Sequence, residues 1–306
     1  MGLFFYLKIN KMVRPEQDIE IITKTKPSLR VAIQGYAGAF HDIASRLCFK
    51  DHDIDVVPAH TFEELVEKLE TDTTIDAALM AIENTLAGSL MHNYSLLNES
   101  QLTISGEVFL RIKQNLMVLP GVKLEDLKEV HSHPVAIEQC RKFFIQHPHI
   151  RLVETVDTAL SAKNILDHNL TDTGAIASTL AADLYGMEII AESIETHHKN
   201  HTRFLVLRRN SHFMEDQKAN KVSISFSLTH EVGSLHSVLA LMAAYNLNLT
   251  KIQSTPIIGK PWEYMFFVDF VMGGKISFEQ GIGAIRPITQ NLKVLGAYPI
   301  GQHHDY

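Results

Sequence analysis

The stretch Asn200-His201-Thr202-Arg203-Phe204-Leu205-Val206-Leu207 sets a hydroxyl and a guanidinium side by side, directly ahead of an apolar run. A continuous apolar run from Phe204 to Leu207 is typical of a strand that is covered on both faces. Thr202 and Arg203 are therefore expected at the entrance of a buried strand, where a ligand can still reach them. The alternative is an ordinary polar-to-apolar transition, because many buried strands open in this way.

Length and composition indicate a globular chain that is large enough for an enzyme. Its 306 residues include 45% hydrophobic and 21% charged side chains, with a formal net charge of −7. This balance argues against nucleic acid or an anionic membrane as the main partner. Cys48 and Cys140 lack a metal-ligand spacing and predict neither a disulfide framework nor a zinc site. The sequence shows no signal peptide and no apolar run of about 18 residues, so we expect a cytoplasmic protein.

Alternating strands and helices organise the chain from residue 30 to about residue 207. Residues 1–28 carry mixed charge without a period and are interpreted as a loose N-terminal extension. Two groups of β-α units follow within a domain over residues 29–210, the first at about 30–108 plus 190–209 and the second at about 112–189. The extended crossings between the groups predict an α/β fold of two lobes with a cleft between them.

Polar side chains gather where several of the predicted strands end. Glu83-Asn84-Thr85 follows a buried strand at residues 75–82, and Ser132-His133-Pro134 follows a short strand at residues 129–131. In an open α/β sheet, ligands bind beyond the carboxyl ends of the strands. The pattern therefore favours a binding site at these positions, with ordinary capped loops as the alternative.

A second architecture is expected after a polar linker at residues 211–220. Val222, Ile224 and Phe226 alternate with serines, as in a half-buried strand. Strand and helix patterns continue to residue 298 and predict the ferredoxin-like order βαββαβ for a domain over residues 221–306. The end of the chain, with His303-His304, is expected to be frayed.

Sequence motifs in register resemble those of the prephenate dehydratase family. They are Gly35-Tyr36-Ala37-Gly38-Ala39-Phe40, Glu83-Asn84-Thr85, Ser132-His133-Pro134 with Gln139-Cys140, Ala175-Ile176-Ala177-Ser178 and Asn200-His201-Thr202-Arg203-Phe204. The resemblance covers about residues 30–300, and its C-terminal part resembles the ACT regulatory domain of that family. It implies conversion of prephenate to phenylpyruvate with loss of water and carbon dioxide, and no metal or organic cofactor.

The resemblance also implies roles for individual residues. Thr202 is expected to donate a proton to the departing hydroxyl, and Arg203 is expected to bind a substrate carboxylate. Phe204 is expected to pack under the ring of the substrate. Glu83 is expected to orient Arg203 or to donate when it is protonated. In a regular strand Thr202 and Arg203 point to opposite faces, so a shared pocket requires a loop or a sharp twist. The other catalytic or substrate-binding candidates are Asn84, Ser132, Gln139, Ala39, Thr85 and Ser178.

The resemblance of the C-terminal part to an ACT domain predicts that an amino acid bound at a subunit interface controls the activity. L-Phenylalanine is the expected allosteric ligand, and a homo-dimer or homo-tetramer is the expected assembly. Gln253-Ser254-Thr255-Pro256 departs from the usual Glu-Ser-Arg-Pro of the family, which predicts weaker binding. The candidate binding residues are Gly233, Ser234, Leu235, Asn248, Leu249, Gln253 and Ser254.

Two positions of the N-terminal domain also depart from the family's pattern. His41 stands where a small hydroxyl residue often follows the glycine turn, and Asp157 stands where a serine commonly precedes a threonine. Other functions stay open: an arogenate dehydratase, whose substrate has an amine in place of the ketone, a non-enzymatic amino-acid sensor and a solute-binding protein. His197-His198 with His201 is a candidate metal cluster, although a solvated loop is the expected form.

Overall fold

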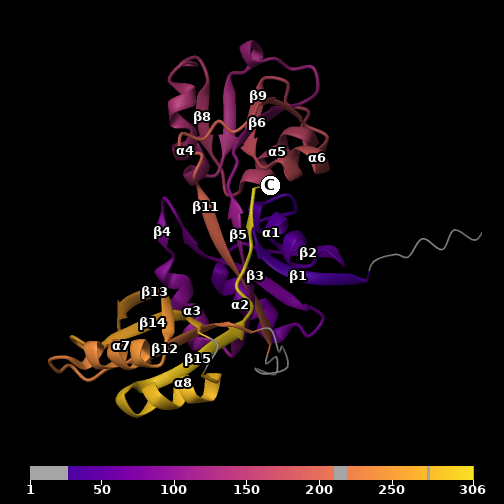
Figure 1. The fold of residues 1–306 in the computed structure, drawn as a ribbon. Helices are drawn as coiled ribbons and strands as arrows, with labels where there is room; N and C mark the ends of the chain where they lie inside the picture. Colours follow the sequence, from indigo (N-terminus) through magenta and orange to yellow (C-terminus); the bar gives the residue numbers. More distant parts are fainter. Residues whose placement is uncertain (1–26, 210–218, 274–275, 306) are drawn as a thin grey trace, which may run out of the picture.

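The computed structural model describes residues 27–209, 219–273 and 276–305. It shows two α/β lobes, one above the other, and a third unit beside the lower lobe (Figure 1). Residues 1–26 of the expected extension and residues 211–218 of the expected linker lie outside the described residues. In the described ranges, no helix has the length and apolar character needed to span a membrane.

The first lobe contains a mixed sheet in the order β16-β5-β11-β3-β1-β2, with the short β4 (Gly88–Ser89) paired to β3. Its long strands are β1 (Ser28–Gln34), β2 (Asp53–Ala59), β3 (Ala77–Asn84), β5 (Leu102–Arg111) and β11 (His201–Arg209). Helix α1 (Phe40–Cys48) packs on one face, and α2 (Phe62–Thr71) and α3 (Met91–Glu99) pack on the other. Strand β11 alternates between these faces, since Phe204 packs with α1 whereas Leu205 packs with α2 and α3.

The second lobe contains a sheet in the order β10-β6-β9-β7-β8. Its strands are β6 (Asn115–Val118), β7 (Glu129–Ser132), β8 (Arg151–Glu154), β9 (Thr173–Ala177) and β10 (Glu188–Ala191). Its helical elements are η1 (Leu124–Asp126), α4 (Pro134–Phe144), α5 (Thr158–Asp167) and α6 (Thr179–Tyr185). Because β10 pairs with β6, the chain rejoins the first sheet at His201, later than the expected boundary at residue 190.

The third unit has the expected βαββαβ order and an antiparallel sheet in the order β13-β14-β12-β15. Its elements are β12 (Lys221–Ser227), α7 (Ser234–Ala244), β13 (Leu247–Pro256), β14 (Tyr264–Met272), α8 (Phe278–Ile285), η2 (Arg286–Ile288) and β15 (Gln290–Tyr298). The tail is not frayed. Its strand β16 (His303–His304) pairs with β5, and the His303 ring stacks on Phe109 with centroids 4.4 Å apart.

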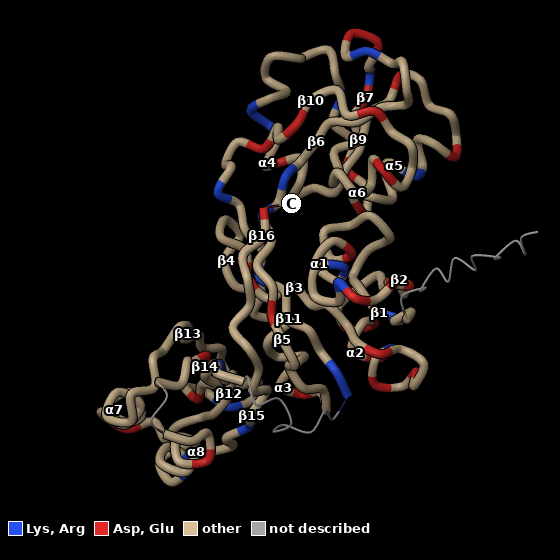
Figure 2. Tube along the Cα trace, turned by 45° about the vertical axis from the view of Figure 1, so that its right-hand side comes forward, with Lys and Arg blue, Asp and Glu red and all other residues tan. Residues whose placement is uncertain are grey.

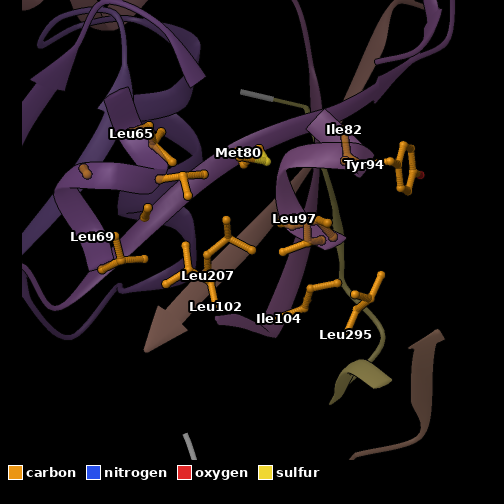
Figure 3. Close-up of a cluster of buried hydrophobic side chains, with 14 of the residues drawn as sticks. Leu65, Leu69, Met80, Ile82, Tyr94, Leu97, Leu102, Ile104, Leu207 and Leu295 are labelled. Atoms are coloured by element: carbon orange, nitrogen blue, oxygen red, sulfur yellow. The ribbon is translucent and has the colours of Figure 1, made fainter. Parts of the chain in front are cut away.

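One hydrophobic cluster joins the C-terminal unit to the first lobe. Leu295 and Tyr298 of β15 are buried with Ile104 of β5 and Leu205 of β11. Figure 3 shows Leu295 beside Ile104 and close to Leu97 of α3, with Leu65 and Leu69 of α2 at the other end of the cluster. The C-terminal unit therefore packs against the face of the sheet that carries the odd-numbered side chains of β11.

Candidate active site

A cavity of about 340 Å³ lies between the two lobes. Figure 2 shows the chain connections between these lobes: β5 runs toward the upper lobe, and the antiparallel β11 runs back from it. Thr202 and Phe204 of β11 and Asn84 of β3 line the cavity from the first lobe. Its other lining residues are Gln34, Ala39, Phe40, His41, Phe62, Ala81, Ala87, Leu90, Ile112, Gln114, His133, Val135, Ala136, Gln139, Val156, Asp157 and Thr158.

Asn84 holds the Thr202 hydroxyl in this cavity. Its Nδ2 atom donates to Thr202 Oγ1 at 2.9 Å and to Asn200 Oδ1 at 2.7 Å. Its Oδ1 atom accepts from the backbone amides of Leu86 and Ala87, both at 2.9 Å, which fixes the orientation of the amide. Because Thr202 Oγ1 accepts a hydrogen bond from Asn84, its own proton remains available for an acceptor in the cavity.

An aromatic group forms part of the cavity wall. The Phe204 and His41 rings meet edge to face with centroids 4.9 Å apart, and Phe62 packs on the other side of His41. His41 Nε2 is buried and has no hydrogen-bond partner among the described residues. Burial lowers the pKa of His41 to about 3. The ring is therefore neutral near neutral pH and is not a source of protons there.

We expect His41 to make the protein less stable as the pH falls. The unfolded chain takes up a proton near the ordinary histidine pKa, whereas folded His41 stays neutral down to about pH 3. Proton uptake by the unfolded state then lowers the free energy of unfolding by about 2 kcal/mol between pH 7 and pH 5. Urea unfolding at the two pH values should show this loss in the native protein and a smaller loss in His41→Gln.

The exposed His236 provides the control, as His236→Gln changes the same chemistry on the surface of α7. This variant should keep the pH dependence of the native protein. An equal pH dependence in His41→Gln and His236→Gln would show that burial of His41 does not shift its titration.

Arg203 does not line the cavity, so the expectation that it binds a substrate carboxylate there is wrong. A β-bulge interrupts the pairing of β11 with β3 between Arg203 and Phe204, and Ile82 of β3 is the extra residue. The irregularity is thus accommodated by β3, while β11 keeps its alternation. Thr202 and Phe204 face the cavity, and Arg203 points to the opposite face, toward the C-terminal unit.

On that face the Arg203 guanidinium is enclosed by acceptors. It donates to Glu107 Oε2 at 2.7 Å, to Asp269 Oδ2 at 2.6 Å and to the Tyr298 hydroxyl at 3.1 Å. Burial alone would lower the pKa of Arg203, but the nearby Asp269, Tyr298 and Glu107 outweigh burial and hold the pKa above its ordinary value. Arg203 is therefore charged, and each of its three nitrogens donates to a protein group.

Glu83 likewise lies outside the cavity and does not orient Arg203. Its carboxylate is 2.8 Å from Lys251 Nζ of β13, and its side chain is 39% exposed. Glu83 pairs with Arg203 in the register of β3 and β11, so both side chains lie on the face opposite to Thr202. Glu83 thus joins the first lobe to the C-terminal unit.

The remaining candidates divide between the cavity and structural positions. Ala39 and Gln139 line the cavity, and Gln139 Oε1 accepts from Gln114 Nε2 at 3.3 Å. Ser132 is fully buried and donates to the Ile176 carbonyl. Thr85 is exposed and bonds to the backbone of the segment before β11. Neither Ser132 nor Thr85 is among the described lining residues.

Ser178 belongs to a contact between the lobes and not to the cavity wall. Its hydroxyl caps α6 by accepting from the Ala181 amide, and it donates to the Gly38 carbonyl at 2.6 Å. Tyr185 of the same helix donates to the Ala37 carbonyl at 2.8 Å. The turn at residues 35–38 of the first lobe is thereby docked on α6 of the second lobe.

Two of the histidines in the candidate metal cluster, His198 and His201, lie next to different acidic side chains. His198 Nδ1 lies 3.3 Å from Glu195 Oε1, and His201 Nε2 lies 3.7 Å from Asp305 Oδ1. Among the described residues, no group of three or more His, Cys, Asp or Glu side chains could hold a metal ion.

Some residues of the cavity were missed as site residues by sequence reasoning. Asp157 caps α5 by accepting from the Leu160 amide, lines the cavity and has its pKa raised by burial. Gln114 is 3% exposed and follows β5 in the crossing between the lobes. The departures at His41 and Asp157 were visible signals, whereas the inward position of Gln114 depends on the packing of two lobes.

Helix starts supply the positive potential of the cavity. Among its described lining residues there is no lysine or arginine. Residues of the first turns of α1 and α4 line it, namely Phe40, His41, Val135 and Ala136. The first amides of a helix have no intrahelical acceptor, and the helix dipole favours anions at this end. The cavity is thus suited to a carboxylate, with the Thr202 hydroxyl close to the bound molecule.

A family model described as prephenate dehydratase matches residues 31–212, which include both lobes. The chain belongs to the prephenate dehydratase family. Arogenate dehydratase 2 of Petunia hybrida is 36% identical over 95% of this chain and 77% of its own length. The bifunctional chorismate mutase/prephenate dehydratase of Enterobacter agglomerans is 31% identical over 88% of this chain and 70% of its own length.

Solved structures of other proteins have the same fold as this chain. A prephenate dehydratase from Arthrobacter aurescens in complex with L-Phe superposes with a TM-score of 0.77 and 26% identity, over 89% of this chain and 90% of the other. A protein described as GqqA, a quorum quenching acylase, gives a TM-score of 0.78 with 28% identity, over 89% of this chain and 98% of its own. Both matches extend over the lobes and much of the C-terminal unit.

Proposed function

We propose that this protein converts prephenate to phenylpyruvate in the cavity between its lobes. The carbon–carbon bond to the ring carboxylate breaks, carbon dioxide leaves, and the released electron pair makes the ring aromatic while the ring hydroxyl departs. The hydroxyl requires a proton to leave as water. The observation that supports this proposal most strongly is the Thr202 hydroxyl, which Asn84 holds in the cavity with its proton free.

The surroundings of Thr202 suit this chemistry. Phe204 lines the same cavity and provides an apolar part of its wall for the ring. The first turn of α1 offers amides for a carboxylate, whereas in α4 Pro134 has no N–H and the Val135 amide already donates to His133 Nδ1. A donor that protonates or hydrogen-bonds the departing hydroxide is worth roughly 10² to 10⁴ in rate.

The experiment is a spectroscopic assay for phenylpyruvate with purified protein and prephenate. We expect turnover without an added metal or cofactor, and a chelator should leave the rate unchanged. Absence of product from both prephenate and arogenate would contradict the enzymatic function and favour an amino-acid sensor.

Arogenate is the second candidate substrate. The position of Asp157 in the cavity wall favours it. The Asp157 carboxyl lines a cavity without lysine or arginine among its described lining residues, so it could accept a hydrogen bond from the amine of arogenate. The same carboxyl, when ionised, would repel the keto acid of prephenate. Turnover of both substrates by the native protein and by Asp157→Ser compares them. If Asp157 selects the amine, the ratio of kcat/KM values should shift toward prephenate by about tenfold, or 1.4 kcal/mol.

We also propose that the C-terminal unit is an ACT regulatory domain that assembles a homo-oligomer, either dimer or tetramer, and binds L-phenylalanine. Within the described residues, β13 pairs only with β14, so one edge of this ten-residue strand is available to another subunit. Gly233 precedes α7 with φ of 86° and no side-chain cap. The Ser234 amide donates to the Glu231 carbonyl, so the amides of Leu235 and His236 are the ones proposed to bind a carboxylate. We also propose a cytoplasmic location, because Cys48 and Cys140 are free thiols and thiols stay reduced in that compartment.

We expect calorimetry of the intact protein to detect binding of L-phenylalanine at micromolar to millimolar concentration. Gly233→Ala should weaken this binding by at least tenfold, since a β-carbon at positive φ strains the helix start. Gly259→Ala is the control, because Gly259 also has a positive φ and open space around it. Absence of heat at millimolar ligand would show that the unit serves only in assembly, which sedimentation would measure independently.

A further inference from the structure

A closed group of buried charges crosses the interface between the first lobe and the C-terminal unit. Arg203 and Glu107 come from the lobe, and Lys221 and Asp269 come from the unit. Lys221 Nζ donates to both oxygens of Glu107 at 2.9 Å, and Arg203 bonds to both carboxylates. Two cations thus face two carboxylates, and none of the four side chains is more than 7% exposed.

The neutral groups around these charges complete the network. Ser223 donates to Asp269 Oδ1 at 2.6 Å, and the Gly301 amide donates to Glu107 Oε1 at 3.1 Å. Every oxygen of the two carboxylates therefore accepts at least one hydrogen bond. A buried network in which every carboxylate oxygen is paired favours one arrangement, because a displacement leaves a charge without a partner.

The network is attached to the strand that carries Thr202, next to an irregularity in the pairing of that strand with β3. Arg203 follows Thr202 directly, and the β-bulge opposite Arg203 and Phe204 disrupts the backbone ladder with β3. The ladder of β11 with β5 is regular from His201 to Val206, so β11 is held by an uninterrupted ladder on that side only. Here the buried guanidinium anchors the neighbouring residue on the opposite face of the sheet.

We propose that Arg203 is a positioning residue, which the network of Glu107, Lys221 and Asp269 holds so that the Thr202 hydroxyl points into the cavity. The C-terminal unit thereby supplies half of the anchor for a group of the active site. This inference rests on the proposed function of Thr202. A displacement of about 1 Å at a reacting group can lower a rate by roughly 10²-fold, so breaking the network should act on turnover.

The test compares variants of the network with a variant of another bridge between the same two parts. Asp269→Asn removes one charge at constant shape, Arg203→Lys removes the planar fork, and Tyr298→Phe removes one acceptor of Arg203. Lys293→Met is the control, since Lys293 of β15 donates to the carbonyls of Asn98 and Ser100 and does not contact β11. Steady-state kinetics are measured where circular dichroism shows each variant to be folded.

We expect Asp269→Asn and Arg203→Lys to lower kcat by at least tenfold with KM changed less than twofold, and Tyr298→Phe to have a smaller effect in the same direction. Lys293→Met should keep kcat within twofold, even if its melting temperature falls. Unchanged kcat in the network variants would overturn the proposal, and so would a raised KM at constant kcat. If the two charge variants do not fold, Tyr298→Phe decides in the same way.

A double-mutant cycle separates this proposal from the function on which it rests. If Arg203 acts through the hydroxyl, Arg203→Lys should lower kcat much less in a Thr202→Ala background than in the native protein. Equal effects in both backgrounds would overturn the positioning role. An active Thr202→Ala would instead contradict the function of Thr202 itself, so the two failures give different results.

Discussion

Thr202→Ala is expected to lower turnover by at least 10²-fold while the protein keeps its fold. The hydroxyl is the proton donor proposed for the departing group, and alanine has none. The loss of stability should be about 1 kcal/mol, because Asn84 Nδ2 also donates to Asn200 Oδ1 and keeps that acceptor in the variant. Steady-state kinetics give the turnover, and binding of an unreactive substrate analogue gives the affinity, which should change little.

Thr202→Ser is the matched control, as it keeps the hydroxyl and loses only a methyl group. We expect it to retain more than a tenth of the native turnover. If Thr202→Ala also retained more than a tenth, a proton donor worth 10² in rate would be excluded at this position.

Gly38→Ala should disrupt the contact between the lobes and with it both stability and activity. Gly38 has φ of +88°, and a β-carbon there would lie 2.9 Å from Ala181 Cα and 3.1 Å from Ala181 Cβ. Left-handed backbone costs a non-glycine residue about 1 to 2 kcal/mol, and overpacking adds about 1 to 3 kcal/mol. We expect the free energy of unfolding to fall by about 2 to 5 kcal/mol. Denaturant unfolding measures this loss, and kcat/KM should fall by more than tenfold as the cavity opens.

Gly88→Ala separates the two contributions, because Gly88 has φ of +83° and no atom within 4 Å of an added β-carbon. It should lose only the backbone contribution of about 1 to 2 kcal/mol. Equal losses in Gly38→Ala and Gly88→Ala would show that the lobes can separate without cost at this contact.

The β-α patterns predicted most elements of the fold because each depends on nearby residues. The start of α2 at Phe62 follows Thr61, whose hydroxyl accepts from the Glu64 amide, as the capping pattern indicates. The C-terminal βαββαβ order is likewise visible in its alternating apolar residues. The membership of β10 in the second sheet and of β16 in the first could not be predicted, because a short strand fits either edge until its partner is known.

The sequence by itself determined which side chains have chemistry to offer. Thr202, Asn84, Phe204, Ala39 and Gln139 could be named from motifs, and the cavity contains all of them. Sequence also determined that Thr202 and Arg203 are neighbours with opposed side chains in any regular strand. It did not determine which strand would take up the irregularity that a shared pocket requires.

Only the tertiary structure decided where the Arg203 side chain lies and which groups it contacts. The bulge is in β3, so β11 stays regular and sends Arg203 to buried carboxylates that lie 96 and 66 residues away along the chain. Likewise, Ser178 became an anchor between lobes and Asp157 part of the cavity wall. The physical reason is the same in each case: motif residues are local, whereas the partner of a buried charge or hydroxyl is chosen by packing between distant segments.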